Sequence, residues 1–291
     1  MDLSKHVFSN FLQPGWLLSA MLLCAAFLAG PGDGRERKDE AKVVHSAAGD
    51  SVGDSGGQLR IPAGTILPVR LNATISAGKA KAGQVITGRI MQDVPLAGGA
   101  RIAVGTKVVG HIIEKVAGSA GARGHVSLQF DRVVTAHQTI AISTNLRAIA
   151  GFMRIAEAQV PLSGTGETEV YRWLTTVQIG GDVVYGEGGP VTSGENPNEI
   201  IGKKVNDGVL GYVKAKQGTK CRGELDGNES PQALWVFSAD ACGTYGMEHI
   251  SIAHAGRTEP VGVIVLASDK DGLKIAGGTG MLLRVDASTG N

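Results

Sequence analysis

Short runs of β-branched and aliphatic residues, separated by Gly and Ala, predict a mainly β protein from residue 58 to 145. The alternation is clearest in the run from His125 to Val134, where His, Ser, Gln and Asp occupy one face and Val126, Leu128, Phe130 and Arg132 the other. This is the period of a half-buried antiparallel strand. The predicted strands are Ile66–Leu71, Gln84–Met91, Thr106–Val116, His125–Val134 and Thr139–Ser143. Strands at such close spacing favour an antiparallel β-barrel or sandwich.

A six-residue phrase occurs three times and is expected to mark strand starts. Arg60-Ile-Pro-Ala-Gly64-Thr is followed by related phrases at 101–106 and 274–279, which place Gly105 and Gly278 at the same position. These glycines are predicted to form structural turns with positive φ, before strands that lie in one barrel or sandwich. Gly makes up 43 of the 291 residues, so chance recurrence in a Gly-rich chain is the alternative.

The middle of the chain changes period. From Asn145 to Val160 the apolar residues fall near helical spacing, which predicts a short amphipathic helix ending at Pro161. The helix is expected to pack on the barrel, with membrane or partner binding as the alternative. Beyond it, the Gly180-Gly181 pair predicts a hairpin between 173–179 and 182–185, and 186–198 is expected to be a long Gly-rich loop.

The last segment contains Cys221 and Cys242, which predict a disulfide because no other cysteine follows the apolar leader. Their Cα atoms are expected about 4.4 to 6.8 Å apart. Further strands are predicted at 233–237, 250–253, 261–266 and 272–285, with a hairpin turn at 268–272.

The N-terminal 30 residues have the order of a secretory signal peptide or N-terminal anchor. The apolar run at residues 16–29 is shorter than the roughly 20 residues of a membrane-spanning helix. Residues 31–58 are polar and rich in Gly, Ser and charge, which is typical of a disordered linker. The sequence therefore predicts a periplasmic or otherwise extracytoplasmic protein, with membrane association through 16–29 left open.

Composition and motifs indicate no particular chemistry. A net charge of +1 without a basic cluster in the β region argues against nucleic acid as a partner. The seven His lack metal-ligand spacing, and no nucleophile or phosphate-loop motif occurs, so no catalytic, cofactor-binding or metal residue is predicted. The carboxylate pairs Glu224 with Asp226 and Glu195 with Glu199 are the residues a glycosidase could use, but both lie in expected loops.

Several short motifs resemble one family. Residues 61–65, Asp93-Val94, Gly105-Thr106 with Gly110, and Phe130-Asp-Arg, together with 275–285, are similar to the C-terminal barrel of TrbI-type conjugation proteins of bacterial type IV secretion core complexes. The resemblance covers about 85 residues at the front and 25 at the back. It implies a periplasmic β-barrel that assembles into rings and has no catalytic activity. About 130 residues lie where that family has a shorter helical excursion.

The expected organisation follows from these segments: a signal or anchor at 1–30, a linker at 31–58, a TrbI-like barrel part at 59–145, an insertion of helix and Gly-rich hairpin at 146–218, and a disulfide-linked β region at 219–291 that closes the barrel. The leading hypothesis is an exported, non-enzymatic structural or assembly component of the cell envelope, with envelope proteins or further copies of itself, in a homo-oligomeric ring, as partners. The alternative is an extracytoplasmic polysaccharide-binding module or hydrolase, indicated by Trp173, Tyr185, Trp235 and Tyr245 in the second half.

Overall fold

A computed structural model describes residues 59–118, 123–158, 174–185, 190–205, 208–214, 221, 230–253, 255, 261–269 and 272–287. All of them belong to the unit formed by Gly56–Asn291. The predicted signal or anchor at 1–30 and the predicted linker at 31–58 lie outside the described residues, as do Trp173, Glu224 and Asp226.

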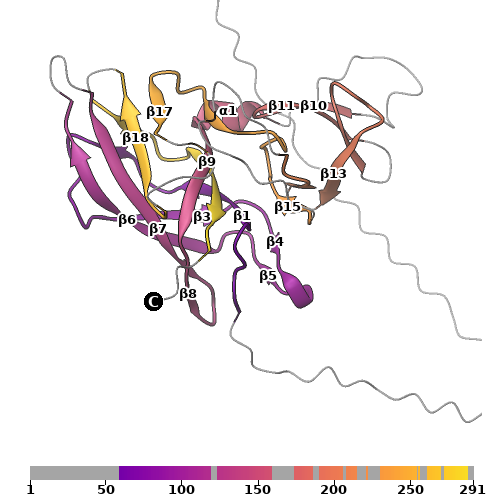
Figure 1. Cartoon of the computed structure of the whole chain (residues 1–291), viewed down its shortest axis with the longest axis horizontal. Helices are drawn as coiled ribbons and strands as arrows, with labels where there is room; N and C mark the ends of the chain where they lie inside the picture. The colour runs from indigo at the N-terminus through magenta and orange to yellow at the C-terminus, as the bar shows by residue number, and fades with distance from the viewer. Residues whose placement is uncertain are drawn as a thin grey trace, which may run out of the picture. The chain divides into compact units, whose positions relative to one another are not determined.

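The larger of two main sheets contains ten strands in the order β16-β9-β20-β1-β3-β6-β7-β18-β17, with β8 paired to β7 (Figure 1). Their bounds are β1 Ile66–Leu71, β3 Val85–Ile90, β6 Lys107–Val116, β7 His125–Val134, β8 Thr139–Ala141, β9 Thr144–Ala150, β16 Gly243–Tyr245, β17 Ile250–Ile252, β18 Ile264–Ser268 and β20 Gly280–Val285. All pairs are antiparallel except β16 with β9. The prediction of a mainly β, antiparallel fold is confirmed, although no closed barrel forms among the described residues.

The predicted strands from 66 to 143 are confirmed as β1, β3, β6, β7 and β8. One detail of β7 is corrected by a β-bulge: Val109 pairs with Arg132 while Gly110 pairs with Phe130, which leaves Asp131 as an extra residue. The bulge reverses the alternation. Arg132 is therefore exposed and Val133 is buried, whereas the sequence pattern had placed Arg132 on the apolar face.

The predicted helix from 145 to 160 is wrong over its first half. Residues Thr144–Ala150 form β9, a central strand between β16 and β20, and every residue in it is buried. A strand buried on both faces has no two-residue alternation, so its apolar residues matched a helical spacing by coincidence. Among the described residues of the predicted helix, Phe152–Glu157 alone is helical, as α1. Within the described residues no helix has the length and hydropathy to cross a bilayer.

The three Gly-Thr phrases adopt one conformation, as predicted. Gly64, Gly105 and Gly278 have φ of 83°, 81° and 85°, the left-handed region that favours Gly. Each Gly N–H donates to the carbonyl of the residue at the end of the neighbouring antiparallel strand, at 2.7 to 2.8 Å. The N–H of that residue donates in return to the carbonyl of the Thr that follows the Gly. We call this arrangement the strand clamp.

The first and last clamps are reciprocal. Gly64 at the start of β1 bonds to Val285 at the end of β20, while Gly278 before β20 bonds to Leu71 at the end of β1. Both ends of the β1–β20 pair are therefore closed by the same device. This confirms the prediction that the C-terminal copy pairs next to the N-terminal one.

A fourth glycine makes the same pair of backbone bonds, with a partner inside β6 rather than at its end, and we count it as a fourth clamp. It escaped the sequence comparison because Gln84 stands where the other copies have Thr. Gly83 has φ of 77° and donates to the Ile112 carbonyl at 2.8 Å, and the Ile112 N–H donates to the Gln84 carbonyl. The clamp therefore depends on the glycine and the backbone, and the Thr side chain is dispensable for it.

The second main sheet has six strands in the sequential order β10 to β15. They are β10 Leu174–Gln178, β11 Gly181–Tyr185, β12 Pro190–Ser193, β13 Ile200–Val205, β14 Gly208–Gly211 and β15 Gln232–Ala233. The predicted β10–β11 hairpin is confirmed, with Gly180 at φ 101°. The predicted loop at 186–198 is wrong in part, because β12 occupies its centre and pairs with both neighbours.

Two further antiparallel pairs are short: β2 Ile75–Ser76 with β19 Lys274–Ile275, and β4 Val94–Pro95 with β5 Arg101–Ile102, which flank a 3-10 turn at Ala97–Gly99. The pairing of β19 with β2 overturns the hairpin predicted at 268–272, since β18 instead pairs with β7 and β17. β18 and β19 are close in sequence but pair with different strands, β7 and β2, that lie far from them in the chain. Local sequence patterns do not encode such long-range pairing.

Two glutamine side chains join the sheets. Gln92, which is completely buried, donates to the Val209 carbonyl at 2.8 Å and accepts from the Val209 N–H at 3.2 Å. The Gln92 amide thus makes with the backbone of Val209 the two hydrogen bonds that a paired strand would make. The Gln232 carbonyl oxygen accepts from the Ile66 N–H at 3.0 Å. A side chain at Gly208 would collide with Gln92, which explains a glycine there.

The predicted strand at 233–237 is wrong beyond Ala233. Trp235 has φ of 55°, and the Phe237 N–H bonds to the Leu234 carbonyl at 3.1 Å, so the chain turns. The Trp235 N–H donates to Gln92, and its ring lies 5.2 Å from the Arg70 guanidinium carbon. These contacts hold a backbone conformation that bulky residues rarely adopt.

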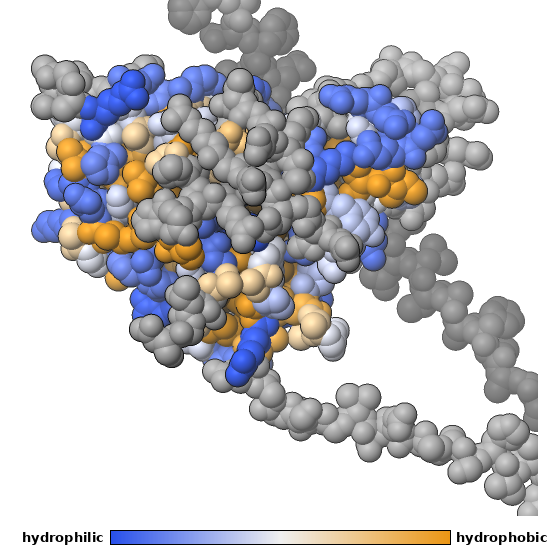
Figure 2. Space-filling model, in the orientation of Figure 1, coloured by the Kyte–Doolittle hydropathy of each residue, from blue (hydrophilic) through white to orange (hydrophobic). Residues whose placement is uncertain are grey.

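Large apolar side chains that remain exposed are dispersed over several elements. Val85 on β3, Phe152 and Met153 on α1, and Ile200 on β13 are each more than half exposed. On the face seen in Figure 2, orange patches are interrupted by blue ones. The face in view therefore presents a mixed surface rather than one continuous apolar area.

Candidate functional site

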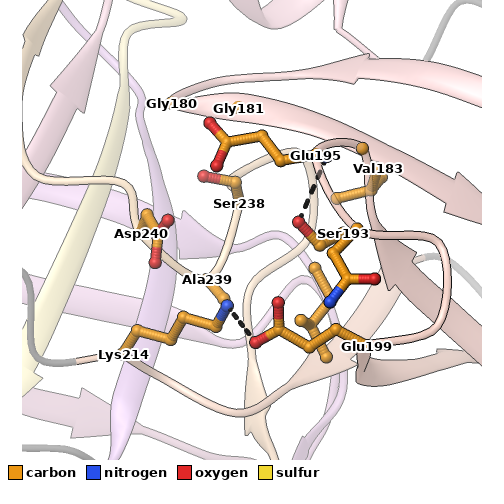
Figure 3. A pocket seen from close by; sticks show the side chains of 13 residues that line it. Gly180, Gly181, Val183, Ser193, Glu195, Glu199, Lys214, Ser238, Ala239 and Asp240 are labelled. Carbon is orange, nitrogen blue, oxygen red and sulfur yellow. Dashed lines mark hydrogen bonds and ion pairs between the residues drawn. The ribbon is translucent and has the colours of Figure 1, made fainter.

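A cavity of about 430 Å³ lies against the second sheet and is the best-formed candidate site (Figure 3). Strands β11, β12 and β13 supply part of its wall, and the chain segment at 238–240 supplies another part. Its volume is in the range of small-molecule sites. The lining residues are Gly180, Gly181, Val183, Ser193, Gly194, Glu195, Asn196, Glu199, Ile201, Lys214, Ser238, Ala239 and Asp240.

The charged lining is mainly acidic. Glu195, Glu199 and Asp240 contribute carboxylates, and Lys214 contributes the one ammonium among the lining residues. The Lys214 Nζ lies 2.6 Å from Glu199 Oε1, so these two side chains form an ion pair with each other. The Glu195 side chain has no hydrogen bond or ion pair with another described residue, although its backbone N–H donates to Ser193 Oγ at 3.3 Å.

Ser238 places a hydroxyl on the cavity wall. Its side chain is only 4% exposed, and its Oγ has no hydrogen-bond partner among the described residues. A buried hydroxyl without a partner is costly, so such groups usually have one. In Figure 3 the Glu195 carboxylate and the Ser238 hydroxyl point toward the same part of the cavity, beside Gly180 and Gly181. A β-carbon at Gly180 would lie 2.8 Å from Ser238 Oγ, which explains a glycine at this turn.

The segment that carries Ser238 and Asp240 is held in place by Arg147 of β9. The Arg147 side chain is completely buried, its Nε donates to the Ala241 carbonyl at 2.9 Å, and its Nη2 donates to the Ala239 carbonyl. Burial lowers the pKa of Arg147 to about 10, and the nearby Asp240 opposes that shift. The guanidinium stays charged at neutral pH, and its hydrogen bonds hold the segment at 238–240 that forms one wall of the cavity.

The predicted disulfide between Cys221 and Cys242 is present. The Cα atoms are 5.6 Å apart, within the expected range, and both residues are buried in the larger hydrophobic cluster. Neither cysteine lines the cavity, and neither do the clamp glycines Gly64, Gly105 and Gly278. These predicted residues therefore lie outside the candidate site.

Trp235 and Tyr245, two of the second-half aromatic residues, do not line the cavity. Trp235 and Tyr245 pack against the second hydrophobic cluster, and the Tyr245 hydroxyl donates to the Cys242 carbonyl at 3.1 Å. No aromatic residue is among the lining residues. Of the aromatic residues that indicated the alternative function, Trp235 and Tyr245 therefore belong to the hydrophobic packing, and Trp173 lies outside the described residues.

Sequence reasoning singled out Glu195 and Glu199 but missed Lys214, Ser238 and Asp240. The last three come from segments 15 to 45 residues farther along the chain, which long-range contacts bring to the cavity. Among the described residues no group of three His, Cys, Asp or Glu side chains could hold a metal ion.

No family model matches the chain, and searches of curated proteins and of solved structures likewise give no match.

Proposed function

We propose that the chain is an exported, non-enzymatic β protein that serves as a structural or assembly component of a bacterial cell envelope. The observation that carries the proposal is the Cys221–Cys242 disulfide, buried in the larger core cluster. Structural disulfides persist in oxidising compartments and are rare in the cytosol. A bond at the centre of the fold, rather than at its surface, supports assembly of this protein outside the cytosol.

The arrangement of strands supports a unit related to the TrbI barrel. The motifs that carry the resemblance lie on or beside β1, β3, β6, β7 and β20. In the larger sheet these strands are neighbours, in the order β20-β1-β3-β6-β7. Motifs from both ends of the sequence thus belong to one block of sheet, as a shared unit requires. The strand clamps at Gly64, Gly105 and Gly278 then serve to make that block rigid.

The test is fractionation of the full-length protein from its native host, followed by chemical cross-linking and light scattering of the purified material. We expect it in the envelope fraction, disulfide-bonded, and in a ring-sized homo-oligomer or in a stable complex with other envelope proteins. A cytosolic monomer with free thiols at Cys221 and Cys242 would refute both export and assembly.

An extracytoplasmic binding module is the second candidate, and the cavity described above favours it. The acidic lining and the buried Ser238 hydroxyl are features of a site that accepts hydrogen bonds from a ligand. Equilibrium binding measurements separate this role from a purely structural one, because a structural part needs no small ligand.

A further inference from the structure

We propose that the cavity at Glu195, Ser238 and Asp240 binds a small organic cation through a primary ammonium group. This site goes beyond the assembly role and does not require it. The proposal stands on two separate observations: an acidic lining, and a buried hydroxyl on the cavity wall that has no partner among the described residues.

The charges favour a cation over an anion or a neutral ligand. The Lys214 ammonium forms an ion pair with Glu199 at 2.6 Å, which leaves Glu195 as the carboxylate that faces a ligand. Arg147 donates to the carbonyls of residues 239 and 241, so its guanidinium is directed to the backbone on either side of Asp240. Glu195 is the carboxylate in the lining whose side chain contacts no described partner, and it supplies the attraction for the cation.

The type of cation follows from the acceptors. An ammonium group has three N–H donors and no acceptor, and it can donate to the Glu195 carboxylate and the Ser238 hydroxyl at once. Charge-assisted hydrogen bonds of this kind are about twice as strong as neutral ones. A metal ion fits less well, because no group of three His, Cys, Asp or Glu among the described residues has the required geometry. Ser238 Oγ would gain the partner that it lacks within the described chain.

A primary ammonium group can come from an amino sugar or from a basic amino-acid side chain, and the experiment distinguishes them. Purified full-length protein is titrated with glucosamine and with Nα-acetyl-lysine amide, and in parallel with their neutral forms, N-acetylglucosamine and Nα,Nε-diacetyl-lysine amide. Binding is followed by calorimetry and by amide NMR shifts. We expect at least one cationic probe to bind, its neutral form not to bind, and added salt to weaken the interaction.

Glu195→Gln is the decisive variant because it removes the charge and keeps the shape, and the side chain has no structural contact to lose. It should weaken binding of the cationic probe by about tenfold or more without changing the melting temperature. Glu114→Gln, at an exposed carboxylate of β6 outside the cavity, is the matched control and should leave binding unchanged. Ser238→Ala should weaken binding as well.

The proposal is overturned by any of three results: neither cationic probe binds, the neutral forms bind as well as the cationic ones, or Glu195→Gln binds like the parent protein. Binding of glucosamine alone would support an amino sugar, and binding of the lysine derivative alone would support a peptide side chain.

Discussion

Individual glycines determine where strands begin in this protein. At Gly83 and Gly105 a β-carbon would meet no atom within 4 Å, yet φ is 77° and 81°. Substitution to Ala at either position therefore tests backbone conformation without a steric collision. We expect Gly83→Ala and Gly105→Ala each to lower the free energy of unfolding by about 1 to 2 kcal/mol in urea titrations.

Gly78 supplies the control for that experiment. A β-carbon there also meets no atom within 4 Å, and Gly78 does not have a positive φ. Gly78→Ala should be neutral or slightly stabilising, since it reduces the freedom of the unfolded chain. Equal effects at Gly78, Gly83 and Gly105 would show that the strand clamp does not depend on a left-handed glycine.

Arg147 is a second residue with a defined structural role. It holds the carbonyls of Ala239 and Ala241 through a planar fork that a lysine cannot reproduce. Arg147→Lys should therefore lower the free energy of unfolding by about 2 to 4 kcal/mol, because buried carbonyls lose their donors. Exposed Arg101, which pairs with Asp93 on the surface, is the control, and Arg101→Lys should cost less than about 1 kcal/mol.

The pKa of Arg147 predicts how that contribution varies with pH. Burial lowers the pKa to about 10, below its value in the unfolded chain, so the unfolded chain holds the proton more tightly between these values. Its titration therefore raises stability only as pH increases above about 10, and contributes no pH dependence between pH 5 and 8. The Arg147→Lys cost should be the same at pH 5.5 and pH 7.5. A cost that changes by more than about 1 kcal/mol across this range would show that other groups titrate with it.

At the scale of elements, the two sheets are joined through Gln92. Its side chain accepts from the N–H groups of Val209 and Trp235 and donates to the Val209 carbonyl. Gln92→Leu keeps the volume but removes the side-chain oxygen that accepts from the Val209 and Trp235 N–H groups, and should cost about 2 to 4 kcal/mol. The Val209 carbonyl keeps its bond from the Leu234 N–H. Hydrogen exchange should accelerate first at Val209. Gln129→Leu, on the half-exposed face of β7, is the control, and similar losses from both would contradict the joining role.

The elements that sequence predicted well share one property: each strand is bounded locally. Ile66–Leu71 and His125–Val134 were located to the residue because alternation or a preceding Gly marks their ends. β9 was mistaken for a helix because both of its faces are buried and its one charged residue, Arg147, is buried with them. Trp235 was placed in a strand because an aromatic residue in a turn with positive φ is rare.

The candidate site was only half predictable for a related reason. Glu195 and Glu199 are four residues apart, so their proximity could be suspected from sequence. Ser238 and Asp240 reach the cavity because Arg147 anchors their segment to β9. That contact spans about 90 residues of sequence, and no local pattern carries information about it. Predictions of turns and of the disulfide succeeded because each needs only one or two residues.

At the scale of the whole molecule, the chain is closed on itself from both ends of the folded region. β1 and β20 are neighbours in the larger sheet, and the disulfide joins two segments of the same hydrophobic cluster. Removal of the disulfide should therefore be felt by the larger core rather than by a peripheral lobe alone. A cross-link between residues 21 positions apart contributes about 3 kcal/mol in the chain-entropy account.

The Cys221→Ser/Cys242→Ser double variant tests this coupling and the compartment together. We expect its urea midpoint to fall by an amount equivalent to about 2 to 4 kcal/mol, in one transition seen alike by tryptophan fluorescence and by circular dichroism. Adding a reductant to the parent protein should produce the same fall and should not affect the variant. Two separate transitions would mean that the disulfide segment folds independently of the larger sheet.

Mass spectrometry of unreduced protein from the native host's envelope completes the test: a linked peptide pair containing Cys221 and Cys242 is the expected result, because an oxidising compartment maintains the bond. Free thiols at both positions in that material would contradict the proposed export, whatever the stability measurements show.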